Sequence, residues 1–177
     1  NRVLCPNGDG QAGCIDTSDA NGITVLGNYI SGGRIGADKQ YHHVYGTTNS
    51  INWEFGWNEV DGTQGYACRG IQFYSTGGSN QYGLSIHDNY IHDIVCNGIN
   101  FATVNPAAGK VEAYNNLLIN VGKGPHPGGG ESNYACVLSS GRSYQGNCGG
   151  GTGTVELYNN LCYNYGTADV NSADSGG

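Results

Sequence analysis

The sequence predicts an all-β fold, a single-stranded right-handed parallel β-helix (solenoid) of about five coils of 27–44 residues that carries disulfides. Three observations predict it. One strand pattern recurs five times along the chain, and a second pattern advances in step with the first. Gly accounts for 32 of the 177 residues and only 12% of the residues are charged, which is unlike a helical protein of this size.

The first pattern is an apolar strand that ends at an asparagine and continues into a second short strand. Apolar residues two positions apart share one face of a strand, so stacked copies bury a continuous core. The Asn side chain at the bend is able to bond to the Asn of the next coil, and a role as a turn former alone is the alternative. The predicted Asn ladder comprises Asn28, Asn58, Asn89, Asn116 and Asn160.

The second pattern is a strand between successive copies of the first, marked by Val44, Ile71, Ile99 and Val137. Its steps of 27, 28 and 38 residues accompany Asn-to-Asn steps of 30, 31, 27 and 44 residues, and joint advance of this kind indicates a true repeat. We expect one domain over residues 1–177. Its parts are an N-terminal disulfide loop at 1–20, coils at 21–165, and a C-terminal tail or the start of a further coil at 166–177.

Residues 86–93 (Ile-His-Asp-Asn-Tyr-Ile-His-Asp), followed by 97–101 (Asn-Gly-Ile-Asn-Phe), are typical of a known superfamily. Over about residues 20–165 the chain resembles the right-handed parallel β-helix proteins, which include pectate lyases and other polysaccharide-processing proteins. The resemblance implies the fold and supports a carbohydrate-related activity. Leucine-rich repeats share part of the pattern, but the segments between the copies here are Gly-rich and β-branched, without helical periodicity.

Seven cysteines without a Cys-x-x-Cys pair indicate disulfides and an oxidising, extracellular compartment. Cys68 and Cys96 each lie three residues before a second-strand marker, Ile71 or Ile99. They should therefore stack on adjacent coils, where strands about 4.8 Å apart allow a disulfide.

The other cysteines predict two further disulfides and one thiol. Cys136 and Cys148 flank an excursion in the longest coil, and Cys5 and Cys14 bracket a Gly-rich segment, so each pair is expected to bond. Cys162 falls in an apolar column and is expected to be a buried free thiol. Pairing of Cys148 with Cys162 is the competing interpretation.

The loops and the outward strand positions carry the candidate catalytic residues. A lyase needs a Lys or Arg that removes a proton, with acids that hold calcium, and a glycosidase needs two carboxyl groups about 5–10 Å apart. The candidates are Lys39, Arg69, Lys123, Glu59, Asp61 and Glu131. Their spacing does not single out an active site, so the sequence favours a function without catalysis. We expect no cofactor, or calcium if the protein is a lyase.

Two further groups of side chains are candidates for binding. His87, Asp88, His92 and Asp93 are candidate metal ligands, with turn capping as the alternative. Aromatic rings suit contact with a sugar or a partner protein, although cross-strand stabilisation explains them equally. The candidates for such contact are Tyr114, Tyr158, Tyr29, Tyr90 and His126.

The formal charge of −7 argues against nucleic acid and anionic membranes as partners. The chain begins at Asn1, which we interpret as a mature or truncated product. The sequence favours an extracellular structural module that stacks end to end with copies of itself in a fibre or surface assembly, because no capping helix is evident and few charges oppose stacking. The alternative is a polysaccharide-binding or polysaccharide-cleaving β-helix protein.

Overall fold

The computed structural model describes residues 1–5, 13–32, 41–63, 68–75, 80–124, 134–139, 153–166 and 168–172. Every named element in these ranges is a β-strand, and the named strands pair in parallel. The predicted all-β parallel solenoid is therefore confirmed. Within the same ranges, the chain forms no helix with the length and hydropathy that crossing a membrane requires.

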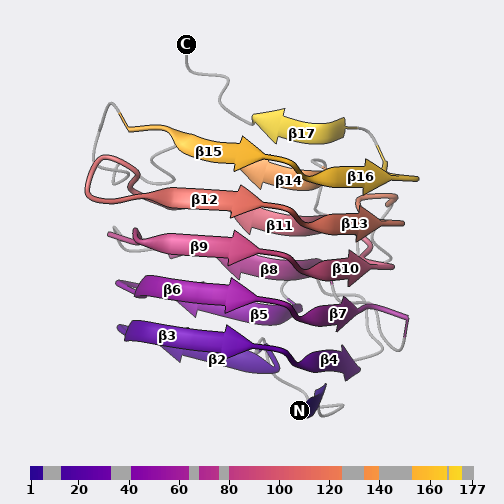
Figure 1. Ribbon diagram of the computed structural model, residues 1–177, viewed down its shortest axis with the longest axis horizontal. Coiled ribbons are helices and arrows are strands. Elements are labelled where there is room, and N and C mark those ends of the chain that lie inside the picture. The colour runs from indigo at the N-terminus through magenta and orange to yellow at the C-terminus, as the bar shows by residue number, and fades with distance from the viewer. Residues whose placement is uncertain are drawn as a thin grey trace.

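The strands form three sheets, and successive coils add one strand to each (Figure 1). Sheet A has six strands: β1 (Arg2–Cys5), β4 (Tyr29–Gly32), β7 (Glu59–Asp61), β10 (Tyr90–His92), β13 (Leu117–Ile119) and β16 (Leu161–Tyr163). Sheet B has six: β2 (Ile15–Ser18), β5 (His42–Thr47), β8 (Arg69–Phe73), β11 (Asn97–Phe101), β14 (Ala135–Ser139) and β17 (Ala168–Ser172). Sheet C has five: β3 (Asn21–Leu26), β6 (Ile51–Gly56), β9 (Leu84–His87), β12 (Val111–Tyr114) and β15 (Val155–Tyr158).

The apolar columns meet in one core between the sheets. Each coil runs from a sheet C strand through the Asn bend to sheet A and then to sheet B. Equivalent residues of adjacent coils are register partners, as in Ile91 with Leu118 and Ile71 with Ile99, and all of these side chains are fully buried. Each coil thus buries its apolar side chains against its neighbours.

The recurring asparagines form a continuous ladder. Each Asn donates both its backbone N–H and its side-chain amide to the Oδ1 atom of the next Asn, at 2.9–3.2 Å. From Asn58 onward, the amide also donates to a carbonyl group of the preceding coil, as Asn89 does to Phe55. The ladder therefore satisfies buried polar groups at every bend that it crosses.

The first twenty residues contain more of the solenoid than the sequence predicts. Strands β1 and β2 extend sheets A and B, and Asn1 occupies a ladder position. The carbonyl oxygen of Asn1 accepts a hydrogen bond from the Tyr29 N–H at 2.9 Å, as that of Asn28 does from the Glu59 N–H at 2.8 Å. The sequence signal was present, because Asn1-Arg2-Val3 repeats Asn28-Tyr29-Ile30 without a preceding strand.

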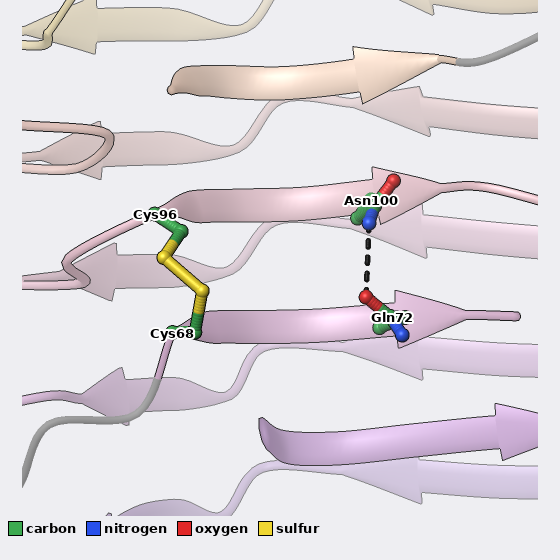
Figure 2. The surroundings of a disulfide bond; sticks show 4 residues. All are labelled: Cys68, Gln72, Cys96 and Asn100. Atoms are coloured by element: carbon green, nitrogen blue, oxygen red, sulfur yellow. Dashed lines mark hydrogen bonds between the residues drawn. A yellow bond between two sulfur atoms is a disulfide. The ribbon is translucent and has the colours of Figure 1, made fainter. Parts of the chain in front are cut away.

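Two disulfides join cysteines as expected from their positions. Cys68–Cys96 links the starts of β8 and β11 (Figure 2), and Cys5–Cys14 links residues near β1 and β2; the Cα atoms are 4.7 Å apart in each pair. Cys148 lies outside the described residues, so its pairing stays a prediction, as does the free thiol at Cys162. The Cys162 side chain is half-buried against the core rather than fully buried.

One residue at the bend before the Asn ladder has a side chain that its left-handed backbone conformation does not favour. The residue before each ladder Asn has a left-handed φ of 52–66°. Gly27, Asp88, Asn115 and Asn159 suit this conformation, but a bulky side chain is strained there. Trp57 occupies the same position with a φ of 53°, and its side chain is 59% exposed.

His43 makes the stability of the fold dependent on pH. It is fully buried, and burial lowers its pKa to about 4. An imidazole in the unfolded chain titrates near a pKa of about 6.5. Between these values the unfolded chain takes up a proton that the folded chain refuses, so stability is complete above pH ~6.5 and falls toward pH ~4.

For His43 alone, we expect the free energy of unfolding to be about 2.5 kcal/mol lower at pH 4.5 than at pH 7.5. The His43→Leu variant should lose a large part of this dependence in urea denaturation at the two pH values. Burial also lowers the pKa of His42, so some dependence remains in the variant. An unchanged pH dependence in His43→Leu would contradict the assignment.

Candidate functional site

The outer face of sheet B carries a row of polar side chains. On β5, β8 and β11, the markers Val44, Ile71 and Ile99 belong to the core, so the following residue in each strand faces outward. Register pairing then places Tyr45, Gln72 and Asn100 side by side across the three coils. At the starts of the same strands His42, Arg69 and Asn97 are also register partners, and the 4.9 Å between the His42 and Tyr45 ring centroids places His42 beside the outward residues. We call the set the sheet B row: His42, Tyr45, Arg69, Gln72, Asn97 and Asn100.

Much of the sheet B row is buried, although it faces away from the core. Gln72 and Asn100 are 5% and 3% exposed, and the Asn100 amide donates to the Gln72 Oε1 atom at 2.9 Å (Figure 2). The Asn100 Oδ1 atom is buried and accepts no hydrogen bond. An unsatisfied buried acceptor costs about 1–3 kcal/mol.

An imidazole, a phenol and a guanidinium adjoin the two amides. The His42 and Tyr45 ring centroids are 4.9 Å apart, and the buried His42 Nδ1 atom has no hydrogen-bond partner. Burial, followed by the positive charge of Arg69, lowers the pKa of His42 well below its ordinary value, so the ring is neutral at pH 7. Arg69 is half-buried, and the exposed Asp16 is the register partner of Tyr45. The face combines neutral hydrogen-bonding groups with one cation.

The structure brings only one candidate catalytic residue, Arg69, to this face. Lys39, Glu131 and the contact candidate His126 lie outside the described residues. Glu59 and Asp61 lie on sheet A, and Lys123 is exposed after β13, where its Nζ atom donates to Asn164 at 2.6 Å. The candidate acids and bases that the structure describes therefore do not meet in one site.

Sequence reasoning missed most of the sheet B row. The signal was a polar residue directly after each second-strand marker, as in Val44-Tyr45, Ile71-Gln72 and Ile99-Asn100. Such residues are normally solvated strand residues, and nothing in the pattern indicates their burial. The missed residues are His42, Tyr45, Gln72, Asn97 and Asn100.

The four candidate metal ligands form two separate pairs rather than one cluster. His87 ends β9 on sheet C and has its Nδ1 atom 2.9 Å from Asp88. His92 ends β10 on sheet A and has its Nδ1 atom 2.7 Å from Asp93. The separation arises because Asp88, with a φ of 52°, turns the chain from one sheet to the next.

The candidate contact tyrosines all contact other side chains of the chain. Tyr114 stacks on His87 at 5.0 Å and on Tyr158 at 4.9 Å, with nearly parallel rings. Stacked rings present their edges to solvent, so they suit cross-strand stabilisation more than a flat contact with a sugar. Tyr29 donates a hydrogen bond to Asp61, and Tyr90 stacks on His92 at 4.4 Å.

The most buried carboxylate on the outer face of sheet C is also satisfied within the chain. Burial alone would raise the pKa of Glu112, but hydrogen bonds from Lys110, Tyr158 and Ser85 outweigh it and lower the pKa. Glu112 is therefore ionised at neutral pH, which does not suit a glycosidase general acid. Together with the engaged rings, this leaves sheet B as the outer face with unfilled hydrogen-bonding positions.

No family model, curated protein or solved structure matches this chain. The parallel solenoid is established by the pairing of its strands. The repeat resembles that of the pectate-lyase-like β-helix proteins, and the comparisons do not show membership of that superfamily.

Proposed function

We propose that this protein binds an extracellular polysaccharide along the outer face of sheet B. The observation that carries the proposal is a contrast between the outer faces. On sheets A and C, carboxylates, ring nitrogens and hydroxyls bind one another, as around Glu112 and His92. The sheet B row instead combines neutral amides and an imidazole with the phenol of Tyr45 and the guanidinium of Arg69, which are both partly exposed.

The chemistry of the sheet B row suits a chain of sugars. A sugar hydroxyl donates one hydrogen bond and accepts others, and amides, a neutral imidazole and a phenol do the same. Equivalent side chains repeat at about 4.8 Å from coil to coil, which lets an extended ligand meet similar groups along the stack. Arg69 adds one cation that pairs well with a carboxylate, which favours an acidic sugar. The disulfides indicate the oxidising compartment in which such polymers occur.

We propose binding rather than cleavage. A lyase or glycosidase needs paired acid–base groups at one point, and the described part of this face offers Arg69 and an exposed Asp16. Neither group faces a second described carboxylate on sheet B.

Binding can be measured by isothermal titration calorimetry with polygalacturonate as the acidic probe and dextran as the neutral one. Arg69→Gln should weaken polygalacturonate binding about tenfold, because it removes the charge that pairs with a carboxylate. The double variant Gln72→Leu/Asn100→Leu should weaken binding of any ligand on this face, because it removes both amides while keeping their volume.

The matched control is Lys123→Gln at an exposed cation after β13, away from sheet B. This change also removes one positive charge, and it should leave affinity unchanged. Equal weakening by Lys123→Gln and Arg69→Gln would point to net charge alone. A protein that binds neither acidic nor neutral polysaccharide in this assay would contradict the proposed function.

A second candidate is stacking with copies of itself in an extracellular fibre. It is favoured by the small share of charged residues, 12%, which leaves little charge repulsion to oppose edge-to-edge pairing of strands. Negative-stain microscopy and light scattering test this candidate, and a stable monomer at high concentration would contradict it.

A further inference from the structure

We propose that Asp61, His92 and Asp93 bind a divalent transition-metal ion, with Zn²⁺ as the best match, on the outer face of sheet A. The ligands come from two adjacent coils, because Asp61 ends β7 and is the register partner of His92, which ends β10. One ligand atom of each residue lies within 4.8 Å of the others. The site is separate from the sheet B row and does not depend on the proposed function.

The His92 imidazole faces more carboxylates than its ring nitrogens can serve. The Nδ1 atom is 2.7 Å from Asp93 Oδ2 and 3.9 Å from Asp61 Oδ1, and the Nε2 atom is 3.3 Å from Glu59 Oε1. One tautomer donates Nδ1–H to Asp93 and the other donates Nε2–H to Glu59. In the second tautomer the lone pair of Nδ1 faces two carboxylates that cannot donate to it. A cation between them turns this repulsion into ligation, and a metal-bound histidine usually donates its second N–H to a carboxylate in this way.

Neighbouring groups hold both carboxylates in place. The Thr63 N–H and hydroxyl donate to Asp61 Oδ1 at 2.8 and 2.6 Å, and the Tyr29 hydroxyl donates to Asp61 Oδ2. The Asn120 amide donates to Asp93 Oδ1 at 3.0 Å. Oriented ligands lose less freedom when the ion binds, and such outer groups usually accompany metal sites.

The donor set and its exposure fit Zn²⁺. One imidazole nitrogen is a borderline donor and two carboxylate oxygens are hard donors; Zn²⁺ binds both kinds, and it accepts three protein ligands with a water in the fourth position. The His92 and Asp61 side chains are largely buried, whereas the Asp93 side chain is about one-third exposed, which leaves one open side. Tetrahedral ligation places ligand atoms about 3.3 Å apart. Asp93 Oδ2 must therefore move slightly away from His92 and Asp61 Oδ1 slightly toward it.

The chain contains a matched control for this site. His87 and Asp88 repeat the His-Asp step, with Nδ1 2.9 Å from Asp88 and Nε2 3.5 Å from Glu54. The register partner of His87 is Gly56, whereas the register partner of His92 is Asp61. The His87 pair thus has the imidazole, the adjacent carboxylate and the outer carboxylate, and lacks the third ligand.

The experiment titrates the purified chain with Zn²⁺ alone by calorimetry and follows Co²⁺ binding by visible absorption. We expect one tight site per chain, visible bands typical of tetrahedral Co²⁺, and a higher melting temperature with Zn²⁺. Asp61→Asn and Asp93→Asn should each weaken Zn²⁺ binding at least tenfold, and Asp88→Asn should leave it unchanged. The wild-type Co²⁺ spectrum tests the site even if one variant fails to fold.

Three outcomes would overturn the proposal. They are no saturable Zn²⁺ binding by the wild-type chain, binding that survives both Asp61→Asn and Asp93→Asn, and equal weakening by Asp88→Asn. The first would leave His92 as part of an ion-pair network only, and the others would place the ion elsewhere.

Discussion

Replacement of Asn89 by alanine is expected to lower the free energy of unfolding by about 4 kcal/mol. The Asn89 Oδ1 atom accepts the backbone N–H and the side-chain amide of Asn58 at 2.9 and 3.2 Å, and its own amide donates to the Phe55 carbonyl at 3.0 Å. Alanine removes these three hydrogen bonds, and a buried group that loses its partner costs about 1–3 kcal/mol. The loss should therefore exceed that of an ordinary surface substitution several-fold.

Urea denaturation, followed through the fluorescence of the buried Trp53, measures this loss. The matched control is Asn28→Ala at the half-buried end of the same ladder, where Asn28 donates its amide to Leu26 of its own coil. The control should lose about 1 kcal/mol or less. Equal losses in the two variants would mean that the ladder contributes only as a set of turns.

Removal of the Cys68–Cys96 disulfide by the double change Cys68→Ala/Cys96→Ala should lower the free energy of unfolding by about 3.5 kcal/mol. The bond joins residues 28 apart in sequence, so it closes a sizeable loop in the unfolded chain. Both side chains are fully buried, so the small apolar side chain of alanine is the replacement that disturbs the surrounding packing least. Urea denaturation of the oxidised wild type and the variant gives the difference.

The second disulfide supplies the comparison. Cys5 and Cys14 are 9 residues apart, so Cys5→Ala/Cys14→Ala should cost about 1 kcal/mol less than the first variant. A larger loss from the Cys5–Cys14 pair would contradict the loop-entropy account of both bonds.

The fold followed from the sequence because each coil repeats the same local requirements. A ladder Asn needs the next Asn at its side, so the five asparagines and the apolar residues around them remained recognisable across steps of 27 to 44 residues. The Cys68–Cys96 pairing followed from the same reasoning, because both cysteines lie at one offset from Ile71 and Ile99. The position of Asn1 in the repeat was not predicted, because the repeat was recognised by the strand before each Asn and the sequence starts at Asn1.

The candidate site could not be predicted in the same way. Alternation along a strand says that Gln72 and Asn100 face outward, but burial of an outward side chain depends on what else in the chain covers it. The Asp61–His92 contact was within reach of the sequence, because each residue lies three positions after a ladder Asn, Asn58 or Asn89. The His87–Asp88 and His92–Asp93 pairs were predicted as one cluster, because the sequence does not show that Asp88 adopts a left-handed conformation that turns the chain between them.

The parallel stacking has a mechanical consequence. Strand pairs join each coil only to the coils beside it, so a force that pulls the ends of the stack apart is carried by every interface in series. The weakest interface yields first under such tension. The interface between β8 and β11 cannot part while the Cys68–Cys96 bond is intact, so rupture is confined to the other coils and these two remain together as a clamped pair.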